Sequence, residues 1–336
     1  MRNTTYILSL TAIFLFLSCT QSISLDRRNE FALSAVVGEL GVEVKSSAAP
    51  FKGLSSDTPL KAQLLCSFEK GKYTNAPVDP WYVPCFTDVS FDSEDITFIK
   101  YNSFSLTYPT PGDKIGDDTG NIYCIGLYDG NNNEWTITET SATHIIDGSV
   151  DLMFADQIAS SWNSTSTPVQ HYTHLQTWIN ILASANTNDV ATQWGKITKV
   201  TIKSSESVTI SFPSGNSNKS DISYSQPRQD IIVYEDPEGK DLSITTSEIG
   251  SVFISPSTSL SVTVHTETFP EGKTLDNIKL YNLQNQEIKD IDKIRGYLFV
   301  LNLNFTPLSI IEGICTLNYW NDQDEDIYLE EVTTTN

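Results

Sequence analysis

Two histidines three residues apart, His171 and His174, are the first candidates for a metal or acid–base site. Side chains at this spacing share one face of a helix but lie on opposite faces of a strand. The segment around them, 169–181, has the aromatic and β-branched composition typical of a strand. We therefore expect two hydrogen-bonded or surface histidines and no pair of metal ligands.

The other patterns that could carry chemistry are incomplete. Alternating aspartates at 321–326 resemble a calcium loop but lack the glycine that its turn requires, and the segment 112–120 indicates a polar loop. The chain has no P-loop, no dinucleotide-binding glycine fingerprint and no nucleophile elbow. The sequence predicts no catalytic residue, no metal site and no cofactor. A hydrolase that uses paired carboxylates is the least favoured class.

Aromatic side chains suggest a different kind of site. Exposed aromatic rings would stack on sugars, whereas most large aromatic residues of a β-sandwich fill its core. A solvent-facing row of tryptophans would favour a glycan-binding surface. The tryptophans are Trp81, Trp135, Trp162, Trp178, Trp194 and Trp320.

Five cysteines, none in a C-x-x-C pair, leave the disulfide pattern open. Once Cys19 is set aside for the reason given next, four thiols allow three complete pairings. A bridge such as Cys66–Cys85, with Cys315 buried or paired elsewhere, and a set of free buried thiols that also includes Cys124 both fit the sequence.

The amino terminus has the pattern of a secretion signal. Arg2 precedes an apolar run at 6–17, and the run ends in Phe16-Leu17-Ser18-Cys19. A small residue directly before a cysteine resembles the lipobox of bacterial lipoproteins, in which the thiol is acylated. We expect 1–18 to be a signal peptide and Cys19 to carry a lipid anchor. The alternative is an ordinary signal that contains a cysteine.

Composition limits the class of protein. The 336 residues include 42 acidic and 21 basic side chains, a net charge of −21, and removal of Arg2 with the signal makes it −22. A polyanion repels phosphate backbones, so we expect no nucleic-acid partner. The hydrophobic content of 39% is too high for a disordered acidic chain.

Strand-like stretches alternate with turn-rich clusters along the chain. Strands are predicted at 61–68, 202–212, 261–266 and 297–305, and the best helical candidate is a short connection at 184–194. This pattern is typical of all-β sandwiches or barrels. The length favours two domains, which we place at 46–195 and 196–336.

Six short motifs then follow one another along the chain: Leu-Thr-Tyr-Pro at 106–109, Cys-Ile-Gly-Leu-Tyr at 124–128, Asp-Leu-Met-Phe-Ala at 151–155, His-Leu-Gln-Thr-Trp-Ile at 174–179, Trp-Gly-Lys-Ile-Thr at 194–198 and Gly-Tyr-Leu-Phe-Val-Leu-Asn-Leu at 296–303. Their order and spacing resemble the fimbrillin family, the subunits of type V pili of anaerobic Gram-negative bacteria. The resemblance, together with the lipobox, extends over nearly the whole exported chain.

The resemblance implies a non-enzymatic lipoprotein precursor with two tandem transthyretin-like β-sandwich domains. In that family a trypsin-like protease removes an amino-terminal strand, and a strand from the tail of the next subunit fills the groove that opens. Such head-to-tail exchange builds a fibre that supports adhesion. The implied partners are other fimbrial subunits and the outer membrane, and the surface ligand is not identified. The alternative is a monomeric surface lipoprotein that binds glycans through exposed aromatics.

The family pattern assigns the segment 19–45 as the pro-segment, with cleavage after Lys45. The strand to be displaced carries the apolar residues Phe31, Leu33, Ala35, Val37, Leu40, Val42 and Val44. Polymerising members usually have Arg at the cleavage point, and Arg27 and Arg28 lie upstream of the strand. This difference indicates an anchor or minor subunit, or a different maturation protease.

The candidate donor strands lie near the carboxy terminus, at 314–320 and 326–332. Their apolar residues are Ile314, Leu317, Tyr319, Ile327 and Leu329. The other interpretation of both segments is that they are native strands of the second sandwich. We also expect 151–155 and 175–181 to be core strands of the first sandwich, with Trp178 buried.

Overall fold

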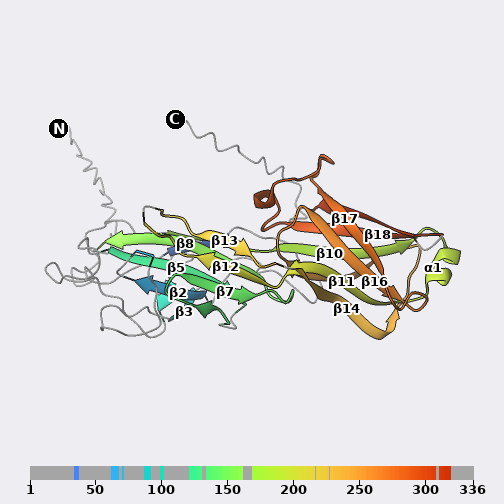
Figure 1. Cartoon of the computed structure of the whole chain (residues 1–336), viewed down its shortest axis with the longest axis horizontal. Coiled ribbons are helices and arrows are strands. Elements are labelled where there is room, and N and C mark those ends of the chain that lie inside the picture. Colours follow the sequence, from blue (N-terminus) through green and yellow to red (C-terminus); the bar gives the residue numbers. More distant parts are fainter. Residues whose placement is uncertain are drawn as a thin grey trace, which may run out of the picture.

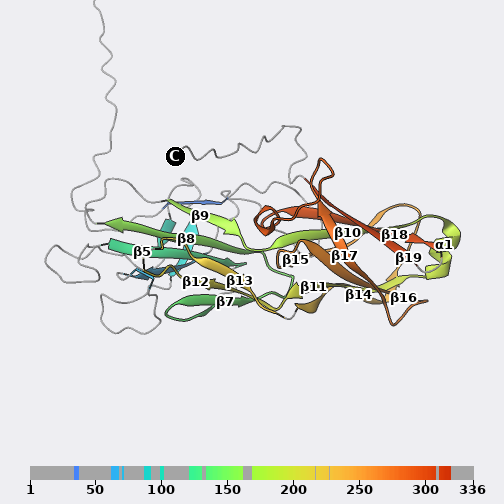
Figure 2. The same cartoon turned by 45° about the horizontal axis from the view of Figure 1, so that its top comes forward.

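In the computed structural model, the described residues are 34–37, 62–67, 70–71, 87–91, 99–101, 121–130, 134–161, 169–215, 217–226, 228–307 and 310–318. This part of the chain is mostly β, as predicted, and its strands form three sheets. Figures 1 and 2 show an elongated molecule in which two groups of strands lie end to end.

Two sheets form the first half of the molecule. A four-stranded sheet contains, in spatial order, β13 (Asp221–Tyr224), β12 (Ser207–Ser211), β7 (Ser141–Ile145) and β6 (Thr136–Ile137). A seven-stranded sheet contains, in spatial order, β1 (Ser34–Val37), β9 (Val169–His174), β8 (Leu152–Ser161), β5 (Asn121–Asp129), β2 (Ala62–Ser67), β3 (Thr87–Phe91) and β4 (Ile99–Tyr101).

The second half is one eight-stranded sheet. Its strand β16 is strictly amphipathic because buried and partly exposed residues alternate along Ser-Leu-Ser-Val-Thr-Val-His-Thr. The spatial order is β14 (Arg228–Lys240), β11 (Ile197–Ser205), β16 (Ser259–Thr266), β17 (Lys273–Tyr281), β19 (Ile310–Leu317), β18 (Leu298–Thr306), β10 (Thr177–Ala185) and β15 (Ser247–Ile254).

The chain crosses between the two halves several times. It passes from β9 to β10 through Leu175 and Gln176, and from β11 to β12 at Glu206. It returns from β13 to β14 after Tyr224. One cluster of buried apolar side chains runs from Leu65 in the first half to Phe305 in the second. The halves are therefore joined by shared packing as well as by the chain.

These crossings correct two predictions. The stretch 202–212 is two strands in different sheets, because the chain changes sheet at Glu206. The segment 175–181 was expected in the first sandwich, but β10 pairs with β15 and β18 of the eight-stranded sheet. Trp178 is buried, as predicted. The division at residues 195/196 stays a prediction, although β12 and β13 after it pair with β7 before it.

The predicted short helix is present as α1 (Asn188–Trp194). The Thr187 side chain caps it by accepting a hydrogen bond from the Val190 backbone N–H at 3.2 Å. Gly195 ends it with φ of 68°, a conformation that glycine adopts readily. A short 3-10 turn, η2, covers Ile291–Lys293. In the described part of the chain, no helix has the length and apolarity needed to cross a membrane.

Candidate assembly site at the β1–β9 edge

Strand β1 lies at the edge of the seven-stranded sheet and belongs to the segment predicted to be displaced. It pairs with β9 in parallel, with Ser34 opposite Val169 and Val37 opposite Tyr172. Strand β8 pairs with the other half of β9, from Tyr172 to His174. The residues of β9 from Val169 to His171 therefore have β1 as their strand partner among the described residues.

The register pairs the two described residues of the predicted strand with buried residues of β9. Ala35 is opposite Gln170 and Val37 is opposite Tyr172, and directly opposed residues share a face of the sheet. Gln170 and Tyr172 are buried, while His171 between them is exposed. The displacement of this strand stays a prediction. Phe31, Leu33, Leu40, Val42, Val44, the cleavage site Lys45 and the lipidation site Cys19 lie outside the described residues.

Gln170 has an unusual environment for an amide. It is fully buried, and neither its Oε1 nor its Nε2 has a hydrogen-bond partner among the described residues. A buried polar group left unpaired costs roughly 1–3 kcal/mol. On the same face, a Cβ on Gly126 of β5 would meet the Tyr172 hydroxyl at 2.1 Å, so only glycine leaves room for this ring.

The predicted donor residues Ile314 and Leu317 lie in β19, inside the eight-stranded sheet. Strand β19 makes eight antiparallel pairs with β18, which run from Phe299–Leu317 to Thr306–Ile310. On its other side it pairs with β17 only at Leu280–Cys315 and Tyr281–Thr316. Tyr319, Ile327 and Leu329 lie outside the described residues. The first candidate donor is therefore a paired strand of its own chain.

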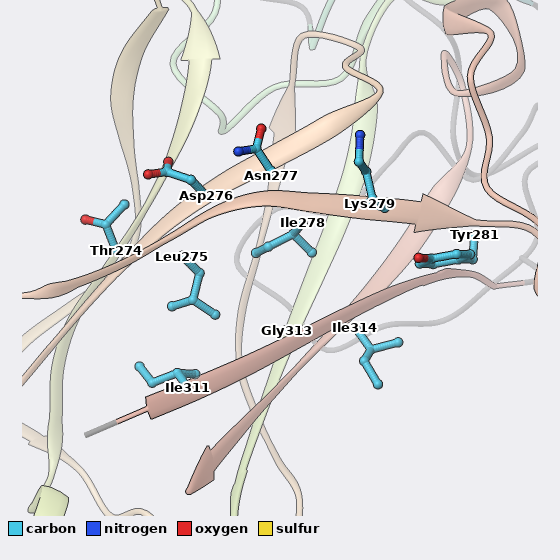
Figure 3. Close-up of a pocket in the computed structure, with 10 residues that line it drawn as sticks. All are labelled: Thr274, Leu275, Asp276, Asn277, Ile278, Lys279, Tyr281, Ile311, Gly313 and Ile314. Carbon is cyan, nitrogen blue, oxygen red and sulfur yellow. The ribbon is translucent and has the colours of Figure 1, made fainter. Parts of the chain in front are cut away.

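Strands β17 and β19 separate on one side of this short contact and leave a groove of about 440 Å³ (Figure 3). A bulge interrupts the pairing of β17 with β16 at Asp276 and Asn277, and the φ of Asn277 is 59°. Leu275 and Ile278 point from β17 toward Gly313, and a Cβ at Gly313 would meet them at 3.3 and 3.2 Å. Side chains therefore fill the gap at this point, although Ile314 beside it is 59% exposed.

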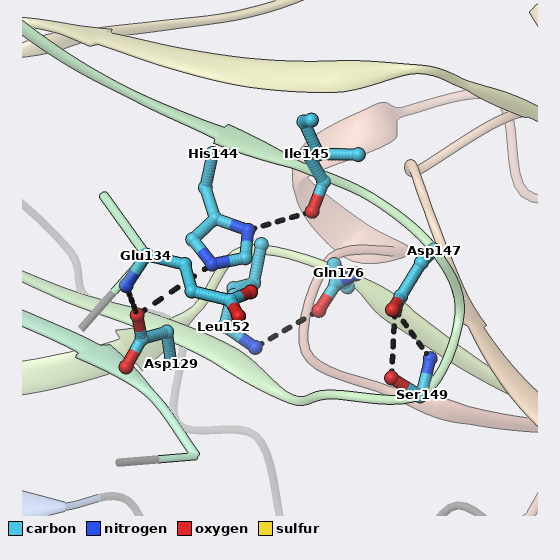
Figure 4. Close-up of polar contacts among 8 residues, drawn as sticks. All are labelled: Asp129, Glu134, His144, Ile145, Asp147, Ser149, Leu152 and Gln176. Atoms are coloured by element: carbon cyan, nitrogen blue, oxygen red, sulfur yellow. Dashed lines mark hydrogen bonds and ion pairs between the residues drawn. The ribbon is translucent and has the colours of Figure 1, made fainter. Parts of the chain in front are cut away.

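A group of buried polar side chains lies at the end of the first half where the chain crosses over (Figure 4). His144 of β7 places Nε2 3.6 Å from an Asp129 oxygen of β5, an ion-pair distance that joins the two sheets. Its Nδ1 lies 2.6 Å from the Ile145 carbonyl oxygen. The same Asp129 carboxylate accepts a hydrogen bond from the Glu134 backbone N–H at 2.6 Å.

The surroundings of His144 favour its charged form. Burial is the largest influence and lowers the pKa of His144, but Asp129, the Ile145 carbonyl and the charge of Glu134 together raise this pKa above 6.5. Burial, followed by the charges of Asp151 and Asp129, raises the pKa of Tyr128 to about 12. The Asp129 carboxylate therefore stabilises the protonated form of the His144 imidazole.

A second histidine contact lies next to the first. His174 Nδ1 is 2.8 Å from Asp151 Oδ1, and His171 is exposed on the other face of β9, so the two histidines diverge as expected for a strand. In the described part of the chain, no three His, Cys, Asp or Glu side chains are arranged to hold a metal ion.

The described tryptophans do not form a sugar platform. Trp135, Trp178 and Trp194 are buried, with Trp194 wedged against Phe269 and Phe305 at 4.7 and 5.0 Å between ring centroids. These three indoles contribute to the core. Trp81, Trp162 and Trp320 lie outside the described residues, as do the acidic segments 112–120 and 321–326.

Sequence reasoning missed three features of this region. They are the buried amide of Gln170, the Asp129–His144 ion pair and the opposition of Cys66 to Cys124 across β2 and β5. Alternation along 169–174 signals that Gln170 shares a face with Tyr172. No local signal brings Asp129 to His144, because they lie on strands of different sheets.

Comparison with known proteins gives the following. No protein-family model matches the chain, and no curated protein matches its sequence. Among solved structures, a candidate cell adhesion protein from Bacteroides uniformis is similar over 87% of this chain and 98% of its own, with 12% identity and a TM-score of 0.48. A fimbrial assembly protein from Parabacteroides distasonis is similar over 86% and 99%, with 11% identity and a TM-score of 0.40.

The fimbrial anchor protein Mfa2 from Porphyromonas gingivalis is similar over 86% of this chain and 98% of its own, with 9% identity and a TM-score of 0.42. TM-scores below 0.5 at such identities are too low to assign a fold family or a role to this chain.

Proposed function

We propose that this chain is a non-enzymatic structural subunit of a cell-surface fimbrium that assembles by strand exchange and supports adhesion. In this proposal it is exported as a lipoprotein through Cys19 and consists of two tandem transthyretin-like sandwiches. The observation that carries the proposal is the position of β1: the segment that the sequence marks for removal supplies an edge strand of the seven-stranded sheet.

An edge strand is the strand that a sheet can exchange at least cost. Strand β1 has one partner, β9, and four residue pairs with it. Cleavage after Lys45 would separate its segment from the rest of the chain and allow it to leave. The first residues of β9 would then present free N–H and C=O groups, which form a template for another extended strand.

The pairing of β1 with β9 is less stable than another strand pairing could be, and this favours exchange. Parallel pairing is slightly less stable per residue than antiparallel pairing. The Gln170 amide, opposite Ala35 in the register, is buried without a hydrogen-bond partner in the part of the chain that the structure describes. An incoming strand that runs antiparallel to β9 and offers a polar group to Gln170 would remove both deficits. The exchanged state would therefore be more stable than the precursor.

The incoming strand in this proposal comes from the tail of another subunit. Using β19 would require the loss of its eight pairs with β18, so the donor is the segment beyond Asn318, with Ile327 and Leu329 as its apolar residues. An acceptor edge in one half and a donor at the carboxy terminus make a contact that does not close on itself. Such a contact produces a filament.

Limited proteolysis tests the proposal. The full chain from residue 19 is treated with a limiting Lys-specific protease, mass spectrometry locates the cut, and unheated gels detect a ladder that collapses on boiling. We expect a cut after Lys45 and a ladder, both absent in the Lys45→Ala variant and retained in the matched Lys52→Ala variant. A cut at Lys45 that leaves only monomers would overturn the exchange mechanism.

A further inference from the structure

Strands β2 and β5 bring two of the five cysteines directly opposite each other. Their antiparallel register runs from Gln63–Leu127 to Ser67–Tyr123 and includes the pair Cys66–Cys124. The two residues are 58 positions apart in sequence, and no sequence motif links them. Only the fold brings them together.

This register meets the backbone geometry of a disulfide. Opposed residues of antiparallel strands have Cα atoms about 4.5–5.5 Å apart, and their side chains leave the same face of the sheet. A disulfide requires Cα atoms about 4.4–6.8 Å apart. We propose that Cys66 and Cys124 form a cross-strand disulfide in the mature protein, and this inference does not rest on the proposed function.

Cys315, the other described cysteine, is not opposite a cysteine in either of its strand pairings. Cys315 of β19 lies between Leu280 of β17 and Leu301 of β18 and is fully buried. Burial raises the pKa of its thiol, so it stays protonated and unreactive at neutral pH. Cys315 is therefore a core side chain, and it serves as the matched control.

The reaction is an ordinary two-electron oxidation. A cysteine thiolate attacks the sulfur–sulfur bond of a disulfide oxidant, such as glutathione disulfide or the disulfide form of a thiol oxidase, and forms a mixed disulfide. The second cysteine displaces the oxidant's remaining sulfur and forms the Cys66–Cys124 bond. The oxidant leaves as two thiols, which take up the two protons. Cys124 is fully buried in the folded protein. The disulfide therefore forms during folding, while the oxidant can still reach the thiol.

The position of the bond gives it a mechanical role. In the sheet order, β2, β3 and β4 connect to β8, β9 and β1 through the β2–β5 ladder. A covalent link across this ladder prevents these two groups of strands from separating. It also closes a long loop of the unfolded chain, which lowers the entropy of that state.

Thiol mapping tests the inference. The full chain is refolded in a buffer of reduced and oxidised glutathione, alkylated in denaturant and digested without reduction. We expect a peptide pair that joins Cys66 to Cys124 and is lighter than its reduced form by two hydrogens. A bridge between Cys66 and Cys85, any other main linkage, or alkylation of both Cys66 and Cys124 would overturn it.

Unfolding gives a second readout that does not depend on mapping. Reductant should lower the thermal midpoint of the wild-type chain by roughly 10 °C, and of the Cys315→Ser variant by a similar amount. The Cys66→Ser variant should show no such response. An equal response of the Cys66→Ser variant to reductant would contradict the assignment.

Discussion

The buried pair Asp129–His144 should couple the stability of the first half of the molecule to pH. The two side chains are 4% and 6% exposed, come from different sheets and lie 3.6 Å apart. The perturbation is a double-mutant cycle of Asp129→Asn and His144→Gln. Each single change removes one charge of the pair and leaves the other charge buried without its ion-pair partner.

The burial of both side chains sets the free-energy cost of each substitution. Removing one partner of a buried ion pair costs about 3–5 kcal/mol of unfolding free energy. In the Asp129→Asn variant the new amide oxygen can still accept the Glu134 N–H, so we expect the lower end, about 3 kcal/mol, for this change. The coupling energy of the cycle should reach about 2 kcal/mol in acid.

The direction of the pH dependence follows from the raised pKa of His144. A histidine with a raised pKa binds its proton more tightly in the folded state than in the unfolded state. Its contribution is complete below the unfolded value of 6.5 and is lost as the pH rises through the folded pKa. The coupling energy should therefore be largest in acid and fall in alkali.

Urea unfolding at about pH 5.5 and about pH 9 measures this coupling. Tryptophan fluorescence follows the unfolding, and Trp135, one of the six tryptophans, has its ring 5.0 Å from that of His144. The exposed His171, changed to Gln, is the matched control and should leave the midpoint unchanged at both pH values. A coupling energy that is constant or rises with pH would refute this reasoning.

Two further pairs of substitutions test packing, one at Trp194 of α1 and one at the glycines of two turns in the first half. Trp194→Ala should lower the free energy of unfolding in urea by about 3–5 kcal/mol. Trp194→Phe loses the 3.0 Å hydrogen bond to the Thr306 carbonyl but keeps a ring, so it should lower this free energy by about 1–2 kcal/mol. Equal losses of stability in the two variants would show that the ring contacts are unimportant. Gly148→Ala should destabilise by several times more than Gly215→Ala in thermal unfolding, by about 3 against about 1 kcal/mol. Both glycines have positive φ, but a Cβ at Gly148 would lie 2.5 Å from Val252, whereas a Cβ at Gly215 would have no described atom within 4 Å. Similar losses of stability in the two variants would contradict the crowding at Gly148.

Much of the fold follows from local patterns in the sequence. Alternation predicted β16 and β18 to within a few residues, and the polar segment at 184–194 predicted α1, which Thr187 caps. The spacing of His171 and His174 correctly predicted opposite faces of a strand. Each of these features depends on residues that are neighbours in the chain.

Sheet membership could not be predicted in the same way. Continuous β-prone sequence at 202–212 hides the change of sheet at Glu206, because both strands have the same alternation and the crossing takes a single residue. The pair Asp129–His144 joins strands of two different sheets, and the pair Ala35–Gln170 joins strands that are far apart in sequence. Their register depends on the whole sheet, which no local pattern specifies.

Locking β1 to β9 tests most directly whether assembly requires the release of this strand. Ala35 and Gln170 are direct partners in the parallel register, so the double substitution Ala35→Cys with Gln170→Cys should form a disulfide. After cleavage at Lys45, we expect this variant to stay monomeric until reductant is added and then to form the ladder, with wild-type protein in the same reductant as the control. A ladder that forms equally well with the lock closed would show that β1 does not have to leave, and would contradict the proposed exchange.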